Sequence, residues 1–341
     1  MNIITGATGF IGYRLVQQLL ARGETVRCLV RPSSKTKSLE NLPVEIIQVD
    51  FNDLDSLVQA VRGARRAFHV AGCVASTNEK EMFNANCNVT DLLAEACIRQ
   101  ETPPTFLYVS SLAASGAEVH DGELREEWMR PQPVSVYGRS KIQAERLLRK
   151  RANDLPITIV RPPIVLGPGD RNGLPLFKGI SQSNIHFCPG WKRKQFSVVL
   201  GDDVAQILIL AAEKGKRLLN VPENYVPNDP SETGIYNVSR DVHLEYGELG
   251  RAVGRALGKK RIFVKYTALP VFWTVCAVAE LIGQLKRKPL ILNLDKYREA
   301  AAGSWTASMK KIAQELEFQP QGDFEDLLRQ TAEDYRNRGW L

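Results

Sequence analysis

A tyrosine and a lysine stand four positions apart at Tyr137 and Lys141, in the segment YGRSK. Residues at this spacing lie one turn apart on the same face of a helix. A free tyrosine has a pKa of about 10 and is a poor acid or base at neutral pH, but a nearby cation lowers that pKa. The pair therefore predicts an acid–base tyrosine activated by a lysine, although the same spacing also occurs by chance on exposed helices.

Two serines, Ser110 and Ser111, follow an apolar run from Thr105 to Val109 that is typical of a buried strand. In a parallel sheet the carboxyl ends of the strands face the ligand crevice, so Ser111 is expected to polarise a carbonyl group there, with Ser110 beside a cofactor. Asn86, on a predicted helix from Glu81 to Arg99, is a candidate for holding the lysine or a water in a proton path. The alternative for Asn86 is an ordinary position on the helix surface.

The segment GATGFIG at residues 6–12 places three glycines at G-x-x-G-x-x-G spacing. It lies between a predicted strand, Asn2 to Thr5, and a predicted helix, Phe10 to Arg22. Glycines there allow a tight turn and a close approach of the backbone to a pyrophosphate, whose charge then sits at the helix N-terminus. The pattern alone is weak, but its place between strand and helix predicts a dinucleotide site. The expected contacts are Gly6, Thr8, Gly9, Phe10, Ile11 and Gly12.

Arg31 follows the second predicted strand, Thr25 to Val30, where an NAD enzyme holds an acidic residue for the ribose 2′-hydroxyl. A guanidinium suits a 2′-phosphate instead, so Arg31 with Lys35 favours NADPH over NADH, while NAD stays an option. The alternative for Arg31 is a solvated loop charge. Further expected cofactor contacts follow the next two strands: Asp50 toward the adenine amino group with Phe51 behind it, and the small residues Ala71 and Gly72.

Strands and helices alternate along the first half of the chain, which predicts an α/β fold with a Rossmann-type, doubly wound parallel sheet. After Pro162 the regular alternation stops, and breaker residues also gather from Pro222 to Pro230. We therefore expect a dinucleotide-binding domain and a smaller, mainly helical substrate-binding domain toward the C-terminus. The first comprises residues 1–163, with 196–214 and 234–240 returning to it, and the second comprises 164–195, 215–233 and 241–341.

The whole-chain composition is that of a globular enzyme. The net charge is +7, but the basic residues are scattered, which argues against a nucleic-acid partner. The six cysteines are widely spaced and form no C-x-x-C pair, so we expect free thiols in a reducing cytoplasm and no metal site. Because a strand is predicted from Asn2, we expect no cleaved leader.

An apolar segment from Ala268 to Leu285 is nearly long enough to cross a bilayer. Glu280 and Gln284 inside it argue against a span, since a charge at membrane depth is costly. A buried helix of the second domain is the preferred interpretation. A peripheral helix touching a membrane through residues 268–288 is the alternative.

Together these motifs resemble the extended short-chain dehydrogenase/reductases, and the likeness covers essentially the whole chain. The resemblance implies that Tyr137 is the general acid or base, that Lys141 binds the nicotinamide ribose, and that Ser111 holds the substrate oxygen. It also implies Pro162 in the cofactor site and a homodimer. The motifs that carry it are Thr5 to Gly12, Asp50, Val70 to Gly72, Asn86, Ser110 with Ser111, Tyr137 with Lys141, and Arg161 with Pro162.

The chain departs from the nucleotide-sugar branch of that family. Epimerases and dehydratases usually carry an asparagine after the sixth strand, whereas this chain reads RPPIVLGP from Arg161 to Pro168. It looks more like the branch of dihydroflavonol 4-reductase and the 3β-hydroxysteroid dehydrogenases. We therefore expect NADP(H)-dependent interconversion of a carbonyl and an alcohol on a hydrophobic ring compound. The apolar helix near Phe272 and Trp273 is expected either to wall the pocket or to lie against a membrane that stores the substrate. The alternatives are a nucleotide-sugar epimerase or dehydratase with bound NAD, and a non-catalytic NADPH-binding sensor or scaffold.

Overall fold

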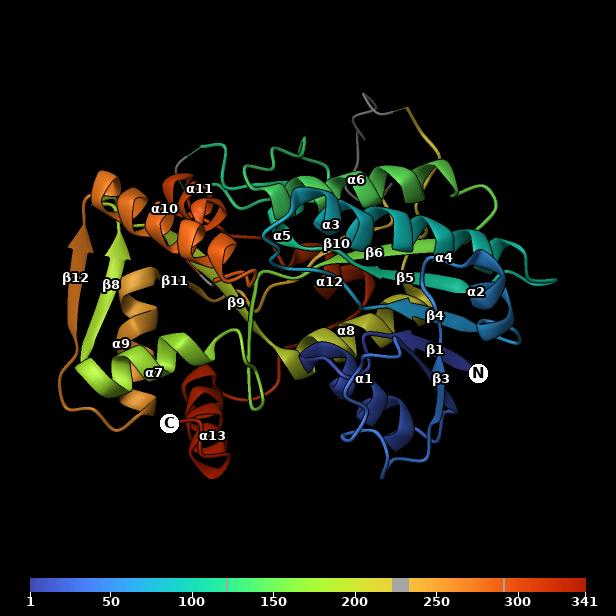
Figure 1. The fold of residues 1–341 in the computed structure, drawn as a ribbon, viewed down its shortest axis with the longest axis horizontal. Coiled ribbons are helices and arrows are strands. Elements are labelled where there is room, and N and C mark those ends of the chain that lie inside the picture. Colours follow the sequence, from blue (N-terminus) through green and yellow to red (C-terminus); the bar gives the residue numbers. More distant parts are fainter. Residues whose placement is uncertain (121, 223–232, 291) are drawn as a thin grey trace.

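A seven-stranded parallel sheet forms the larger part of the protein in the computed structural model (Figure 1). The structure describes residues 1–120, 122–222, 233–290 and 292–341. The strand order is β10-β6-β5-β4-β1-β2-β3, which is doubly wound as the sequence predicts. The strands are β1 (Asn2–Thr5), β2 (Val26–Val30), β3 (Glu45–Gln48), β4 (Arg66–His69), β5 (Thr105–Val109), β6 (Ile157–Arg161) and β10 (Ile235–Asn237).

Helices cover both faces of this sheet, so most residues of its central strands are buried, as expected for a parallel sheet. One core joins the sheet to α1 (Phe10–Ala21) and α8 (Gly201–Lys214). The core on the opposite face joins it to α2 (Leu54–Ala60), α4 (Val89–Ile98) and α6 (Val136–Lys150). The ends of β1, β4 and β5 thus meet at one edge. The shorter elements of this region are α3 (Glu79–Phe83), the π-helical turn η1 (Asn84–Asn88), α5 (Leu112–Ser115) and α12 (Lys310–Glu315).

The second region combines helices with two small sheets that the sequence analysis did not anticipate. One sheet has the order β11-β9-β7 and the other pairs β12 with β8. Its strands are β7 (Ile164–Leu166), β8 (Ile185–Pro189), β9 (Gln195–Leu200), β11 (His243–Glu245) and β12 (Phe263–Thr267). Its helices are α7 (Leu174–Ser183), α9 (Tyr246–Ala256), α10 (Leu269–Leu285), α11 (Leu294–Ala301) and α13 (Phe324–Asn337).

The late segments divide between the two regions. β10 pairs with β6 in the large sheet, and α8 packs on α1, so both lie where the sequence placed returning elements. β9, also within the expected returning segment, pairs instead with β7 and β11. The breaker-rich stretch from Pro222 to Pro230 lies almost entirely outside the described residues.

The prediction that the segment from Ala268 to Leu285 forms a buried helix was wrong. The segment does form α10, but only Cys276 and Gly283 of that helix are buried. The reason is that α10 packs along one narrow side, against α11, and no described element covers its outer side. Within the described part of the chain, no helix is long and apolar enough to cross a membrane.

Candidate active site

The glycine turn between β1 and α1 has room for a ligand only because side chains are absent. Gly6 has a φ of +73°, and a Cβ there would stand 2.7 Å from the backbone nitrogen of Ala71. A Cβ on Gly12 would stand 2.1 Å from the carbonyl oxygen of Gly6. Gly9 caps α1 without a side-chain hydrogen bond, so the first N–H groups of the helix are free to bind an anion. These residues therefore fit a pyrophosphate.

We expect Gly12→Ala to weaken NADPH binding at least about tenfold and to lower the melting temperature, because the new methyl group would push the turn apart. Gly179→Ala is the matched control, since a Cβ on that helical glycine meets no atom within 4 Å. Binding measured by NADPH fluorescence and unfolding measured by calorimetry check both. Equal binding by the Gly12→Ala variant and the wild type would contradict this account of the turn.

The other residues expected in the turn lie around it. Thr8 and Ile11 are half-buried, and Ile11 packs against the core under α1. The ring of Phe10 lies 4.1 Å beneath the guanidinium carbon of Arg14. Arg14, which the sequence analysis missed, also pairs with Asp202 at 3.3 Å and hydrogen-bonds Pro168 of the second region. It thereby fixes α1 against the substrate side.

The residues expected to select the adenosine half of the cofactor follow β2 and β3. Arg31 and Lys35 are exposed, and the Arg31 N–H donates to the Ser34 hydroxyl at 3.1 Å. Asp50 is exposed and accepts from the backbone N–H of Asn52 at 2.9 Å, while Phe51 is buried behind it. Arg31, Lys35 and Asp50 thus stand at the same open edge of the sheet.

The loop after β4 is held by Asn86 rather than by the strand itself. The Asn86 carboxamide accepts from the Cys73 N–H at 2.7 Å and donates to the Cys73 carbonyl at 2.8 Å and to the Ser140 hydroxyl at 2.9 Å. It therefore ties this loop to α6, from the buried side of the η1 turn. A Cβ on exposed Gly72 would meet Asn86 at 3.3 Å and the Lys141 ammonium at 3.5 Å, so the lysine, Gly72 and Asn86 converge. Ala71 precedes them, half-buried.

Ser111 and Tyr137 come together from different elements. Ser111 is the N-cap of α5, and its hydroxyl accepts from the Ala113 N–H at 3.1 Å. Tyr137 lies in the first turn of α6, where the Asp295 carboxylate accepts from its backbone N–H at 3.2 Å. A hydrogen bond with Ser111 favours its phenolate, but burial outweighs this and raises the pKa of Tyr137 to about 12.

The lowered tyrosine pKa that the sequence predicted is thus not observed, and the position of Lys141 explains why. Its ammonium donates to the Val109 carbonyl at 2.7 Å and lies 4.4 Å from the centre of the Tyr108 ring. Burial lowers the pKa of Lys141 itself to about 7, with Glu145 opposing that shift. The amine is therefore only partly charged at neutral pH, and it contacts Val109 and Tyr108 of β5.

A buried ionic cluster behind the site was missed by the sequence analysis. Glu145 pairs with Arg161 at 2.5 Å, and both side chains are under 5% exposed. The Ser110 hydroxyl also donates to Glu145 at 2.5 Å, so it points into this cluster and away from the open edge where we expected a cofactor contact. Leu112 donates to the carbonyl of buried Pro162 at 2.9 Å. The available signal was the spacing of Tyr137, Lys141 and Glu145, which continues one helix face for a third turn.

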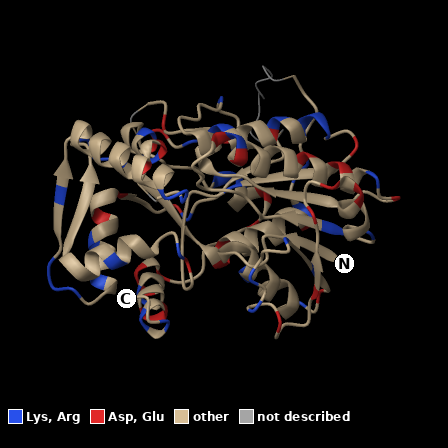
Figure 2. Cartoon of the chain, viewed as in Figure 1, with Lys and Arg blue, Asp and Glu red and all other residues tan. Residues whose placement is uncertain are grey.

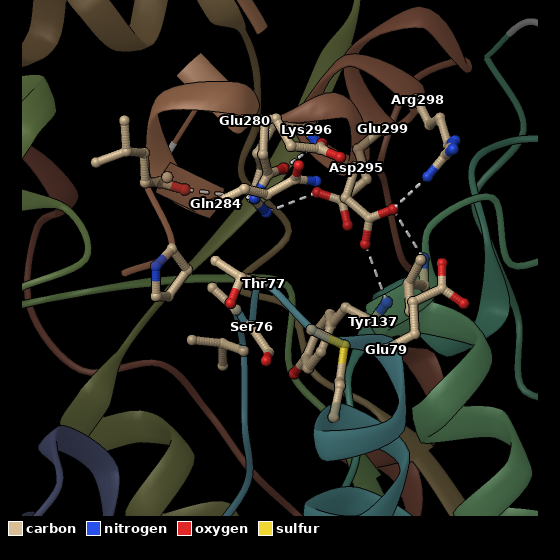
Figure 3. A pocket seen from close by; sticks show the side chains of 18 residues that line it. Ser76, Thr77, Glu79, Tyr137, Glu280, Gln284, Asp295, Lys296, Arg298 and Glu299 are labelled. Atoms are coloured by element: carbon tan, nitrogen blue, oxygen red, sulfur yellow. Dashed lines mark hydrogen bonds and ion pairs between the residues drawn. The ribbon is translucent and has the colours of Figure 1, made fainter. Parts of the chain in front are cut away.

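A pocket opens over Tyr137, whose ring points into it (Figure 3). One wall is formed by residues between Val74 and Met82, and the other comes from α10 and α11. The pocket residues of α10 are Glu280, Gly283 and Gln284. The apolar helix thus does wall the pocket, but through its C-terminal half, because Phe272 packs near Tyr297 and Trp273 is 48% exposed. The charged residues in the lining are Glu79, Glu280, Asp295, Lys296, Arg298 and Glu299.

The glycine turn, the serine and the tyrosine–lysine pair at one sheet edge agree with a comparison to known families. Residues 2–225 match the family described as the NAD dependent epimerase/dehydratase family. The chain belongs to this family. The match confirms the resemblance to the extended short-chain dehydrogenase/reductases, and the protein is an NAD(P)-dependent enzyme of that type.

Individual members of the family are similar along nearly the whole chain. A Synechocystis protein named "Putative dihydroflavonol 4-reductase" is 27% identical over 99% of this chain and 95% of its own. The ceramide reductase of Caulobacter vibrioides is also 27% identical, over 99% and 95%. Among solved structures, the dTDP-glucose 4,6-dehydratase DesIV of Streptomyces venezuelae, with NAD and TYD bound, matches with a TM-score of 0.76 at 21% identity, over 99% of this chain and 98% of that one. That likeness shows the fold.

Proposed function

We propose that this enzyme transfers hydride between NADP(H) and a carbonyl or alcohol group of a hydrophobic small molecule. The observation that carries the proposal is the position of Tyr137, whose ring faces the pocket while its phenol shares a hydrogen bond with Ser111. Two hydroxyl groups of one site can thus reach one substrate oxygen. The glycine turn that fits a pyrophosphate follows β1, which pairs with β4 in the same sheet.

Each side chain has a stated task in the reductive direction. NADPH, when bound, supplies the hydride. Tyr137 donates its phenolic proton to the substrate oxygen as negative charge develops there, and Ser111 donates a hydrogen bond to the same atom. Lys141, beside Gly72, would hold the ribose and supply positive charge. Asn86 positions the loop and α6 through Cys73 and Ser140 and does not itself contact the substrate.

The proposed substrate class rests on the pocket lining, on the sequence after β6 and on the names of two relatives. The pocket includes apolar residues around Tyr137, among them Val74, Met82 and Leu290. Pro163 and Ile164 stand near the position where nucleotide-sugar enzymes of the resembled family carry an asparagine. Relatives along the whole chain are named for a dihydroflavonol and a ceramide, which are both largely apolar molecules with an oxygen to be reduced or oxidised.

Turnover of purified protein with NADPH or NADP on three substrates tests the proposal: a dihydroflavonol, a 3-oxosteroid and a ceramide. We expect turnover with at least one of them, with NADPH preferred. UDP-glucose and dTDP-glucose serve as comparison ligands. Conversion or strong thermal stabilisation by a nucleotide sugar, without turnover of the apolar panel, would instead support the epimerase or dehydratase alternative. Cofactor binding with no turnover of any substrate would support the sensor alternative.

Arg31→Ala tests the cofactor preference. We expect the affinity for NADPH to fall by about tenfold or more while the affinity for NADH changes little, because only NADPH carries a 2′-phosphate for the guanidinium. Arg62→Ala, at another exposed arginine, is the charge-matched control. Titration of both variants with both nucleotides measures the effect. An equal loss for the two nucleotides would show that Arg31 does not read the 2′ position.

A further inference from the structure

The outer side of α10 is an apolar stripe in which Thr274 is the one polar side chain. At about 100° per residue, its six aliphatic side chains fall within roughly 120° of arc, opposite buried Cys276. Their exposed fractions run from 38% for Ile282 to 77% for Leu285. Single exposed apolar residues are ordinary, but a row along four turns is not. The stripe consists of Val271, Val275, Val278, Leu281, Ile282 and Leu285.

The polar residues of α10 place no charge in this stripe. Glu280, the helix's one charged residue, turns toward α11, where its carboxylate accepts from the Leu294 N–H at 2.9 Å. Gln284 lines the pocket beside it. Thr274 returns its hydroxyl to the Pro270 carbonyl at 3.0 Å and so presents no free donor. Glu280 argued against a membrane span in the sequence, and its inward position leaves the outer side of α10 without a charged residue.

Basic residues outnumber acidic ones in the sequence around α10, and Lys286, Arg287 and Lys288 follow the helix directly. Between residues 257 and 294 the sequence has one acidic residue, the inward-facing Glu280, against seven basic ones. Figure 2 shows α10 itself as largely uncharged. Apolar helices flanked by lysine and arginine bind bilayers that carry negative headgroups. The basic residues are Lys259, Lys260, Arg261, Lys265, Lys286, Arg287 and Lys288.

Exposed aromatic residues lie at the same end of the molecule. Trp191 is 73% exposed and follows Gly190, whose N–H bonds the carbonyl of Thr267 just before α10. Trp273 of α10 is 48% exposed, on the side of the helix away from the stripe. Phe187 and Phe263, 60% and 56% exposed, stand on neighbouring strands β8 and β12. Tryptophan favours the boundary between headgroups and acyl chains.

We propose that α10 docks this enzyme on an anionic lipid bilayer, with the helix lying in the plane of the interface and its aliphatic stripe in the acyl region. The positive residues after α10 favour this partner over a second copy of the chain, because the same helix of a second copy would offer them no acidic side chain except the inward-facing Glu280. Since α10 also lines the pocket through Gly283 and Gln284, docking places that wall at the membrane. The relevance of this last point rests on the proposed function, whereas the docking does not.

Vesicle co-sedimentation of the purified full chain tests the docking, with no substrate or NADPH present. We expect binding to vesicles of phosphatidylcholine with phosphatidylglycerol, weaker binding to phosphatidylcholine alone, and a blue shift of tryptophan emission. Leu281→Asp with Leu285→Asp should reduce binding at least about tenfold. Lys286→Gln with Lys288→Gln should remove the preference for the anionic vesicles.

The control adds two acids at exposed apolar sites elsewhere, Val119→Asp with Leu219→Asp, and should bind vesicles like the wild type. NADPH binding by every variant shows that the fold is intact. Equal vesicle binding by the Leu281 and Leu285 variant and the wild type would overturn the proposal. So would a wild-type oligomer that this variant dissociates while neither protein binds vesicles, which would assign the stripe to a second copy. Failure of the substrate panel alone would leave this result unchanged.

Discussion

Tyr137→Phe should lower kcat by about three orders of magnitude while leaving NADPH binding and the melting temperature within error of the wild type. The phenol is the one group of the pocket that carries an exchangeable proton and also bonds Ser111. General acid–base groups contribute factors of about 10² to 10⁴. Phenylalanine keeps the ring that packs in the first turn of α6, so the loss should appear in the chemical step alone.

Single-turnover kinetics with the substrate found in the panel, together with cofactor titration, measure this effect. Tyr266→Phe, which removes a hydroxyl from a half-buried tyrosine of β12, is the matched control and should retain full activity. A Tyr137→Phe variant that keeps more than a tenth of the wild-type rate would mean that another group supplies the proton.

Lys141→Met should have opposite effects on activity and on stability at neutral pH. We expect activity to fall by about 10²-fold or more, since the amine beside Gly72 that would hold the nicotinamide ribose is lost. The stability effect follows from the lysine pKa, which burial lowers from 10.5 to about 7. Above pH 7 the folded protein releases this proton while the unfolded chain keeps it, so raising the pH stabilises the wild type. The methionine variant has no such gain.

The stability of the variant relative to the wild type should therefore fall by up to about 2 kcal/mol between pH 7 and pH 9. The cysteines of the unfolded chain, with an ordinary pKa of 9.0, ionise in the upper part of this range, but they do so in both proteins and cancel in the difference. Urea unfolding across this range is the measurement. Lys178→Met, at an exposed lysine of α7, should show no change with pH. A flat difference for Lys141→Met as well would contradict a buried, partly neutral amine.

Local sequence patterns were sufficient for the sheet and for the glycine turn. The strands from Asn2 to Thr5 and from Thr105 to Val109 were predicted to the residue, because each is a short apolar run followed by turn-forming residues. The GATGFIG turn was equally readable, since its function is a property of the backbone. The tyrosine–lysine spacing likewise identified one face of α6.

Contacts between distant segments could not be predicted from the sequence. Nothing in the sequence pairs Glu145 with Arg161, or Asp295 with the start of α6, because those contacts depend on the packed fold. The apolar segment from Ala268 to Leu285 was assigned to the interior because apolar content predicts burial. No described element covers the outer side of the helix that it forms. Composition gives the preference of a side chain for an apolar environment and leaves open whether protein or another phase supplies it.

The carboxylate of Asp295 has a consequence for how the enzyme is made. It accepts the N–H groups of Val136 and Tyr137 at 3.0 and 3.2 Å, from 159 and 158 positions further along the chain. During synthesis the nucleotide-binding turn emerges first and its strands can pair early. The helix that bears the phenol receives this late partner only when the final part of the polypeptide leaves the ribosome. A nascent or prematurely terminated chain can therefore acquire its nucleotide-binding half well before its active site is complete.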